Sequence, residues 1–187
     1  EESASCDNVK IGTSIKIFYD TFSDIKNWID NYYAESGKFG FKEIAWLSNH
    51  IKLNVFKLGR LQFKFGYSKI DYEPLGVKIG DMAIEVHIPQ GEKLDYEKCR
   101  ESYEMAREFF TKYYSDYNIK VFTCMSWLLD ESVCKMVGEN SNIYKFAKDY
   151  DIVFSVERNS AIRYVFGDAY VNKDVNEYPT NSSLQKN

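Results

Sequence analysis

Hydrophobic and polar residues recur along this chain with two spacings, one typical of α-helices and the other of β-strands. Near the N-terminus, apolar side chains return every three or four residues, which is the spacing of an amphipathic helix. We expect this helix over 24–36, with Ser23 as its N-cap and Gly37 as its end. A second stripe of the same kind predicts a helix over 41–52. The first stripe consists of Ile25, Trp28, Ile29 and Tyr32.

Alternation with a period of two predicts strands elsewhere in the chain. Residues 55–65 form one predicted strand, whose apolar face carries Leu61, Phe63 and Phe65. The segment 120–129 is apolar almost throughout, which predicts a strand buried on both faces. The remaining predicted strands are 14–19, 82–88 and the two halves of a hairpin, 151–157 and 161–167.

Helices separate most of these strands. The clearest one is predicted over 94–114, where Asp95 is the expected N-cap. Two short helices follow further along, one capped by Asp130 and the other opened by Ser141. The turn-rich stretch 66–81 is expected to form a loop or a hairpin. Because helices interleave with strands, the pattern predicts an α/β fold of the α+β type with a mixed sheet.

The composition suits one globular domain. The chain has 187 residues, of which 44% are hydrophobic and 28% are charged. We expect a single domain over 1–187, with its core at about 14–170 and polar tails at 1–12 and 171–187. The first residues include neither an initiator Met nor an apolar signal region. We therefore expect a processed chain or a piece of a longer protein.

Charge and cysteine content exclude several classes of partner. The formal net charge is −4, so an electrostatic surface for nucleic acid or for an anionic membrane is not expected. The cysteines form no CxxC pair and the chain has only two histidines, so a structural zinc site or another metal centre is not expected. Thiols in a reducing compartment, the cytoplasm, are favoured over the two disulfides of a secreted protein. The four cysteines are Cys6, Cys99, Cys124 and Cys134.

Five segments, taken together, resemble a known family. They are DIKNWIDNYYAESGKFGFKEIAWLSNHI, FKLGRLQFKF, EVHIPQGEKLDYEKCRESYEMAREFF, FTCMSWLLD and NSNIYKFAKDY. Over residues 20–187 the sequence resembles bacterial GNAT-like acyltransferase C-terminal domains, which follow an N-acyltransferase N-terminal domain in the same protein. The resemblance implies a GNAT fold, whose central strands, at 82–88 and 120–127, splay apart to admit pantetheine. It also implies transfer of an acyl group, from acetyl-coenzyme A or another acyl-coenzyme A, to an amine or similar acceptor on a small molecule or peptide.

Two titratable residues stand out on the predicted strand 82–88. Glu85 and His87 are two positions apart, so their side chains share one face of the strand. An amine acceptor must lose a proton during acyl transfer, and a carboxylate or an imidazole can accept it. Since the resemblance implies a base on this strand, both residues are candidate bases. The alternatives are that the two groups bond to each other or that this face only meets solvent.

The resemblance implies roles for further residues. Tyr144 is the implied acid that protonates the leaving thiolate. Arg60 and Gln62 share a strand face and are expected to contact the acceptor, unless Arg60 forms an ordinary salt bridge with Glu85. A Cys–His pair of Cys124 with His87 is a further alternative. The implied contacts with coenzyme A are Ile88, Gln90, Gly91, Ser126 and Asn142.

The segment between the strand and the long helix departs from the family pattern. Most GNAT enzymes carry an Arg/Gln-x-x-Gly-x-Gly/Ala loop there, whose N–H groups hold the pyrophosphate. This chain has PQGEKLDYE instead, with one glycine and three acidic residues. The alternative function is therefore a catalytically silent GNAT-fold module, which would bind a ligand or pack on its N-terminal partner domain.

Overall fold

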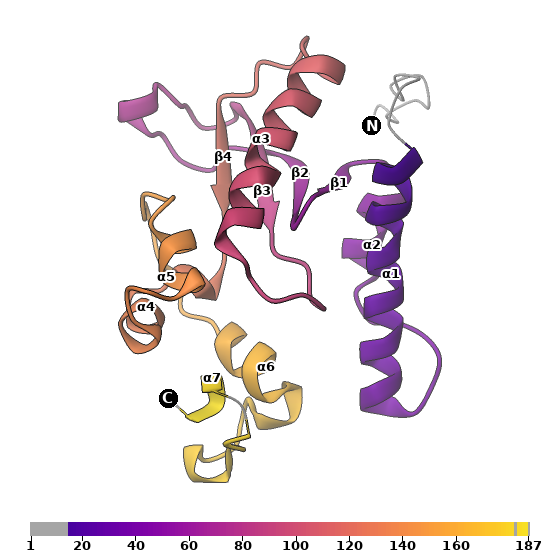
Figure 1. Cartoon of the computed structure of the whole chain (residues 1–187), viewed down its shortest axis with the longest axis vertical. Coiled ribbons are helices and arrows are strands. Elements are labelled where there is room, and N and C mark those ends of the chain that lie inside the picture. The colour runs from indigo at the N-terminus through magenta and orange to yellow at the C-terminus, as the bar shows by residue number, and fades with distance from the viewer. Residues whose placement is uncertain (1–14, 182, 187) are drawn as a thin grey trace. The chain divides into compact units, whose positions relative to one another are not determined.

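The computed structural model describes residues 15–181 and 183–186. The predicted tail 1–12 and its Cys6 lie outside the described residues. The chain divides into two compact units, one ending at Cys124 and the other beginning at Met125. Figure 1 follows the elements of each unit by label. None of the helices in the described part has the length and hydropathy needed to span a bilayer.

Helix α1 spans Ile15–Ser36, so the strand predicted at 14–19 is wrong. Six alternating residues are too few to separate a strand period from a helical one, and the ring stacking of Phe18 on Phe22 shows the helical spacing. Ser23 is not an N-cap, because it lies within α1 and its hydroxyl donates to the carbonyl oxygen of Asp20 at 2.6 Å. Helix α2 follows at Ile44–Ile51, inside the predicted range.

A four-stranded mixed sheet forms the centre of the first unit, which confirms the predicted fold class. The spatial order is β1-β2-β3-β4, with β1–β2 and β2–β3 antiparallel and β3–β4 parallel. The single strand predicted over 55–65 is instead a hairpin that turns at Gly59 and Arg60. Gly59 has φ +68°, a left-handed conformation that favours glycine. The strands are β1 Val55–Leu58, β2 Leu61–Tyr67, β3 Met82–His87 and β4 Val121–Cys124.

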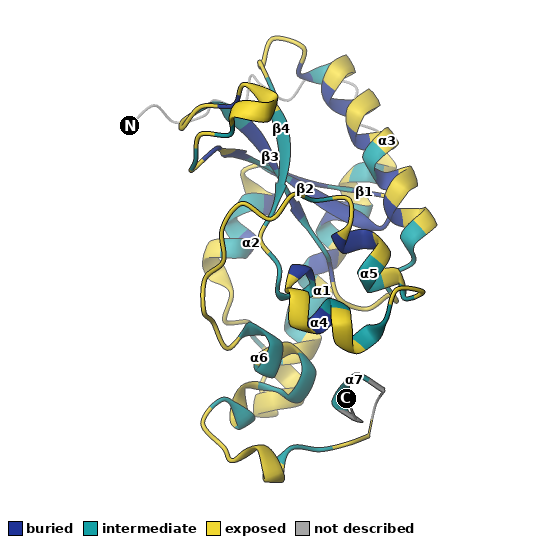
Figure 2. Ribbon diagram, turned by 90° about the vertical axis from the view of Figure 1, so that its left-hand side faces the viewer, coloured by how far each residue is buried: buried dark blue, intermediate teal, exposed yellow. Residues whose placement is uncertain are grey.

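The register of the ladders gives the sheet one apolar and one polar face. Phe63 pairs with Val86 and Phe65 pairs with Ile84, which places apolar side chains on the same face. Helix α3, at Tyr96–Tyr113, packs there through its own aromatic residues, including Phe110 at 5.3 Å from Phe65 between ring centroids. Figure 2 shows the buried residues on the strands and along one side of α3. The polar face carries Lys57, Gln62, Lys64, Glu85 and His87.

The predicted helix over 94–114 is confirmed as α3. Its N-cap is Asp95, whose carboxylate accepts the backbone N–H of Lys98 at 3.0 Å. Buried Cys99 and Ala106 lie on its inner side. Of the stretch 66–81, the first two residues still belong to β2 and the rest is mostly loop, with a short 3₁₀ helix, η2, at Glu73–Leu75.

The second unit consists of short helices. The caps predicted at Asp130 and Ser141 are confirmed, because their side chains accept the N–H groups of Ser132 and Tyr144. The apolar run predicted as a strand over 120–129 leaves the sheet after Cys124 and continues into a 3₁₀ helix. The helical elements are η3 Trp127–Leu129, α4 Glu131–Val137, α5 Asn142–Ala147, α6 Ser160–Phe166, η4 Asp168–Tyr170, η5 Val175–Glu177 and α7 Ser183–Lys186.

The hairpin predicted over 151–157 and 161–167 is wrong. The first half has neither helix nor strand, and its apolar residues are exposed, with Ile152 at 60% and Phe154 at 47%. The second half forms α6. β-Branched residues favour strands only where a partner strand pairs with them, and none of the described strands pairs with this segment.

Candidate active site

A charged cluster on the polar face of the sheet contains both candidate bases. The carboxylate of Glu85 lies 2.7 Å from Nζ of Lys64 and 3.6 Å from Nε2 of His87. The imidazole of His87 and the ammonium group of Lys64 lower the pKa of Glu85 from 4.5 to about 2, although burial acts in the opposite direction. Glu85 therefore remains a carboxylate at neutral pH and is a weak base. Its position suits it to orient the imidazole.

The backbone of β2 makes room for this carboxylate. A Cβ atom at Gly66 would lie 2.6 Å from Oε1 of Glu85, so any other residue here would force the Glu85 side chain to shift. The glycine therefore allows Glu85 to lie flat against the neighbouring strand, beside Lys64. The sequence interpretation missed this relationship, because only the register of β2 against β3 reveals it.

His87 is held on more than one side. Its Nε2 atom is buried and faces Glu85 at a distance slightly longer than a hydrogen bond. The indole ring of Trp46, from α2, lies 4.5 Å from the imidazole between ring centroids. Since the side chain is 35% exposed, we infer that the ring edge away from Glu85 is the one that reaches solvent. A proton from a bound amine would therefore reach the imidazole at that edge.

A second polar cluster lies behind Trp46 and was not predicted from the sequence. Asp24 is only 4% exposed, and its Oδ2 accepts the indole N–H of Trp28 at 3.0 Å and that of Trp46 at 3.2 Å. Nε2 of the fully buried His50 lies 3.5 Å from the same oxygen. Burial raises the pKa of Asp24, but the neighbouring side chains of His50 and Gln62 and the hydrogen bonds from the two indoles outweigh it and lower the pKa to about 2. The available signal was an acidic residue next to the apolar stripe, four positions before Trp28.

Gln62 takes part in this buried cluster. It is 1% exposed and pairs across the sheet with His87. Its amide is one of the groups that lower the pKa of Asp24. Because Gln62 is buried, the structure does not favour the acceptor contact expected for it. Its amide lies near Asp24 of α1 instead.

Arg60 has a different role from the two that we considered. Its guanidinium donates to the carbonyl oxygens of Pro89 at 3.0 Å, Glu92 at 2.6 Å and Lys93 at 3.0 Å. The side chain is 4% exposed, and burial lowers its pKa. The group thus faces the loop between β3 and α3, which corrects the expected ion pair with Glu85 and does not support an acceptor contact.

The same loop carries three of the residues expected to contact coenzyme A. Ile88 is partly buried, whereas Gln90 and Gly91 are exposed. The side-chain oxygen of Gln90 accepts the amide N–H of Asn31, on α1, at 2.5 Å. The parallel ladder between β3 and β4 covers Ala83–Val86 and Val121–Cys124 and then ends. The expected splay of the two strands would therefore begin at His87.

Three other expected site residues belong to the second unit. The hydroxyl of Ser126 accepts the N–H of Leu128 at 3.2 Å, and Asn142 is the exposed first residue of α5. Tyr144 is partly buried, with Nζ of Lys148 5.2 Å from the centre of its ring. Their roles beside the sheet residues stay predictions.

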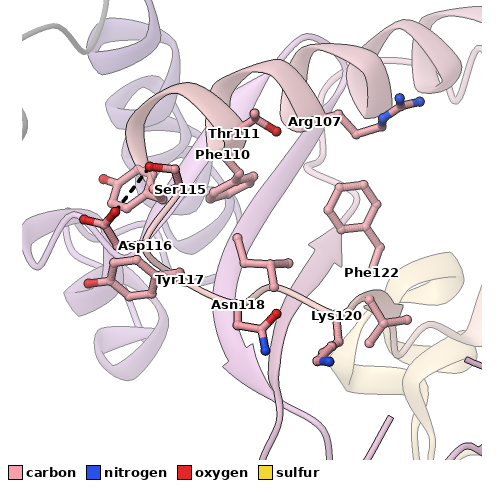
Figure 3. A pocket seen from close by; sticks show the side chains of 12 residues that line it. Arg107, Phe110, Thr111, Ser115, Asp116, Tyr117, Asn118, Lys120 and Phe122 are labelled. Carbon is pink, nitrogen blue, oxygen red and sulfur yellow. Dashed lines mark hydrogen bonds between the residues drawn. The ribbon is translucent and has the colours of Figure 1, made fainter. Parts of the chain in front are cut away.

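One open hollow in the first unit lies away from this chemistry. Its volume is about 550 Å³, and it lies at the C-terminal end of α3 and the segment leading into β4. Arg107, Tyr117 and Phe122 are among the lining residues drawn in Figure 3. The loop that Arg60 holds is at the other end of α3. Neither of the candidate bases, Glu85 and His87, lines this hollow, so the candidate site is the side-chain cluster around them. Within the described residues, no group of three or more His, Cys, Asp or Glu side chains is arranged to hold a metal ion.

Solved acyltransferase structures share this fold. One is an acyltransferase in complex with decanoyl-coenzyme A and teicoplanin, with a TM-score of 0.77 and 24% identity over 91% of this chain and 52% of that chain. Another is an acyltransferase mutant in complex with octanoyl-coenzyme A, with a TM-score of 0.78 and 24% identity over 92% of this chain and 52% of that chain. The chain thus spans about half the length of these structures, and the likeness shows the fold. No curated protein is significantly similar to the sequence.

Two family models match adjacent parts of the chain. Residues 10–53 match the N-acyltransferase N-terminal domain, and residues 55–187 match the GNAT-like C-terminal domain. The C-terminal match thus begins at β1 rather than near residue 20, and α1 and α2 lie in the N-terminal match. Over residues 55–187, the chain belongs to the family of GNAT-like C-terminal domains.

Proposed function

We propose that this chain is part of an acyltransferase that moves an acyl group from coenzyme A to an amine or similar acceptor. The observation that carries the proposal is the position of His87. Its imidazole is held by Glu85 and Trp46 at the point where the ladder between β3 and β4 ends. Membership in the GNAT-like family and the acyl-coenzyme A complexes of structurally similar acyltransferases support the same chemistry.

In this proposal His87 is the general base. The acceptor nitrogen attacks the thioester carbonyl carbon, a C–N bond forms and the C–S bond breaks. His87 takes the proton that the nitrogen loses, and Tyr144 gives a proton to the departing thiolate. Glu85 is too weak a base for this step, since its pKa is about 2, and instead holds and stabilises the imidazolium that forms.

The loop between β3 and α3 fits a coenzyme A phosphate site better than its acidic sequence suggested. Glu92 is offset by Lys57, whose Nζ lies 3.6 Å from its carboxylate. Asp95 is occupied as the N-cap of α3. We propose Ile88, Gln90 and Gly91 as contacts along this loop, together with Ser126 and Asn142 from the second unit.

The proposal extends to the acyl group that is transferred and to the cellular location. Related structures are described with decanoyl- and octanoyl-coenzyme A, so we propose a medium-chain acyl group ahead of the acetyl group first expected. We propose the cytoplasm as the location, since the thiol of Cys134 suits a reducing compartment, and the proposal of a bacterial source rests on the family resemblance alone.

The test is acyl transfer itself. The protein is incubated with decanoyl-, octanoyl- or acetyl-coenzyme A and a panel of primary amines, and acylated products are identified by mass spectrometry. We expect amine-dependent release of coenzyme A thiol with at least one donor. Binding of acyl-coenzyme A without any transfer would favour the silent module, whose supporting observation is the loop with a single glycine.

A further inference from the structure

We propose that Arg60 is a positioning residue that fixes the loop at 89–94 with its backbone N–H groups turned outward to hold the phosphates of coenzyme A. This inference rests on the proposed function. In glycine-rich loops of this fold, the loop sequence itself sets the loop conformation. In this chain, one buried side chain, Arg60, would do so instead.

The three bonds of the guanidinium determine how the loop is oriented. Arg60 donates from Nη1 to Pro89, from Nη2 to Glu92 and from Nε to Lys93, in each case to the backbone carbonyl oxygen. A buried guanidinium must satisfy its donors, so these carbonyl groups are held toward Arg60. The loop is thereby attached to the sheet at three points rather than by its own hydrogen bonds.

Peptide geometry then gives the direction of the N–H groups. In a trans peptide, the N–H of the following residue points opposite to the carbonyl group. The N–H groups of Gln90, Lys93 and Leu94 therefore point away from Arg60. Within the described residues, none of these three N–H groups donates to a backbone carbonyl oxygen. They lie immediately before Asp95, whose carboxylate caps α3, so the loop N–H groups rather than the capped helix end are the donors available to a phosphate.

Arg60 is itself anchored to α3. Its backbone N–H donates to the hydroxyl oxygen of Ser102 at 2.8 Å, and the hydroxyl donates to the carbonyl oxygen of Lys98 at 2.7 Å. A Cβ atom at Gly59 would lie 2.7 Å from that hydroxyl oxygen, so the β1–β2 turn sits directly on the helix. The turn, the loop and the first turns of α3 are thus linked through Arg60 and Ser102.

The experiment compares Arg60→Met and Arg60→Lys with the parent protein. Arg107→Met is the control, since it removes the same charge from an exposed position on α3. Affinity is measured by calorimetry for coenzyme A and for pantetheine, which lacks the phosphates. Limited trypsin cleavage after Lys93 reports the order of the loop, and thermal melting shows that each variant is folded.

We expect both Arg60 variants to lose about tenfold or more in affinity for coenzyme A, equivalent to about 1.4 kcal/mol, and to be cleaved faster after Lys93. Their affinity for pantetheine and all properties of Arg107→Met should match those of the parent. Unchanged affinity for coenzyme A in folded Arg60→Lys, or an equal loss for pantetheine, would overturn the inference alone. A parent protein that binds no coenzyme A would instead overturn the proposed function, and the cleavage rates would then decide whether Arg60 orders the loop.

Discussion

The ring centroids of Trp46 and His87 lie 4.5 Å apart, which brings α2 into contact with the candidate base on β3. The two residues come from different family matches, since Trp46 lies in the N-terminal match and His87 in the C-terminal one. Trp46 is in turn held by its hydrogen bond to Asp24, on α1. The candidate site is therefore built from both parts of the chain.

Replacing this tryptophan should separate activity from stability. Trp46→Phe and Trp28→Phe each remove one indole hydrogen bond to Asp24, so each should destabilise the fold by about 1.5–3 kcal/mol. We expect only Trp46→Phe to lower turnover beyond its effect on stability, because Trp46 also contacts His87. Denaturant unfolding and acyl-transfer rates of the two variants check this. Equal activity losses would mean that the Asp24 cluster acts only through stability.

The base and its carboxylate partner should respond differently to substitution. His87→Ala should lower turnover by about 10²–10⁴-fold, the usual effect of losing a positioned base, with little change in melting temperature because the side chain is partly exposed. Glu85→Gln should also lower turnover more than stability, through loss of the charge that orients His87. Both quantities are measured on the same preparations.

A purely structural pair would behave in another way. If the pair served only the fold, loss of either partner would destabilise the protein and lower activity in proportion. Large melting shifts with proportionate losses of activity in both variants would assign Glu85 and His87 to the fold rather than to catalysis.

Two carboxylates should make the fold sensitive to acid. The folded-state pKa values of Glu85 and Asp24 are both lowered to about 2, from ordinary values of 4.5 and 3.8. Groups with lowered pKa values contribute stability that is complete above the ordinary value and is lost as pH falls toward the folded value. The free energy of unfolding should therefore fall between about pH 4.5 and about pH 2, and Glu85→Gln should reduce this slope. A variant with the parent's slope would show that Glu85 does not cause it.

The cysteines should differ in their reaction with a thiol reagent. Cys99 is fully buried in α3 and should not react in the native protein, whereas Cys124 and Cys134 are partly buried and should react slowly. Burial also raises the pKa of Cys134, which reduces its thiolate fraction. Mass spectrometry after labelling gives the order of reaction. Rapid labelling of Cys99 would contradict the packing of α3 on the sheet.

Local signals predicted the parts of the fold that depend on neighbouring residues. The caps at Asp95, Asp130 and Ser141 were found because an N-cap acts within one helical turn. The hairpin predicted after residue 150 failed because strand formation depends on a partner that the sequence does not reveal. The break at Gly59 was missed because alternation continues through a tight turn.

The candidate site was predictable only in part, for a similar reason. Glu85 and His87 were found together because they are two residues apart on one strand. Their partners Lys64, Gly66 and Trp46 come from other elements, and only the register of the sheet and the packing of α2 bring them close. Arg60 was assigned to a ligand because the sequence cannot show that three loop carbonyls already occupy it.

The most direct test of the account is a calorimetric titration of the protein with decanoyl-coenzyme A. We predict saturable binding at one site, with thermal stabilisation equivalent to about 2.7 kcal/mol when the ligand is at 100 times its Kd. Titration with free coenzyme A should also show binding, because the phosphates bind at the loop. The absence of binding heat and of any melting shift with either ligand would contradict the assignment of this chain to acyl transfer.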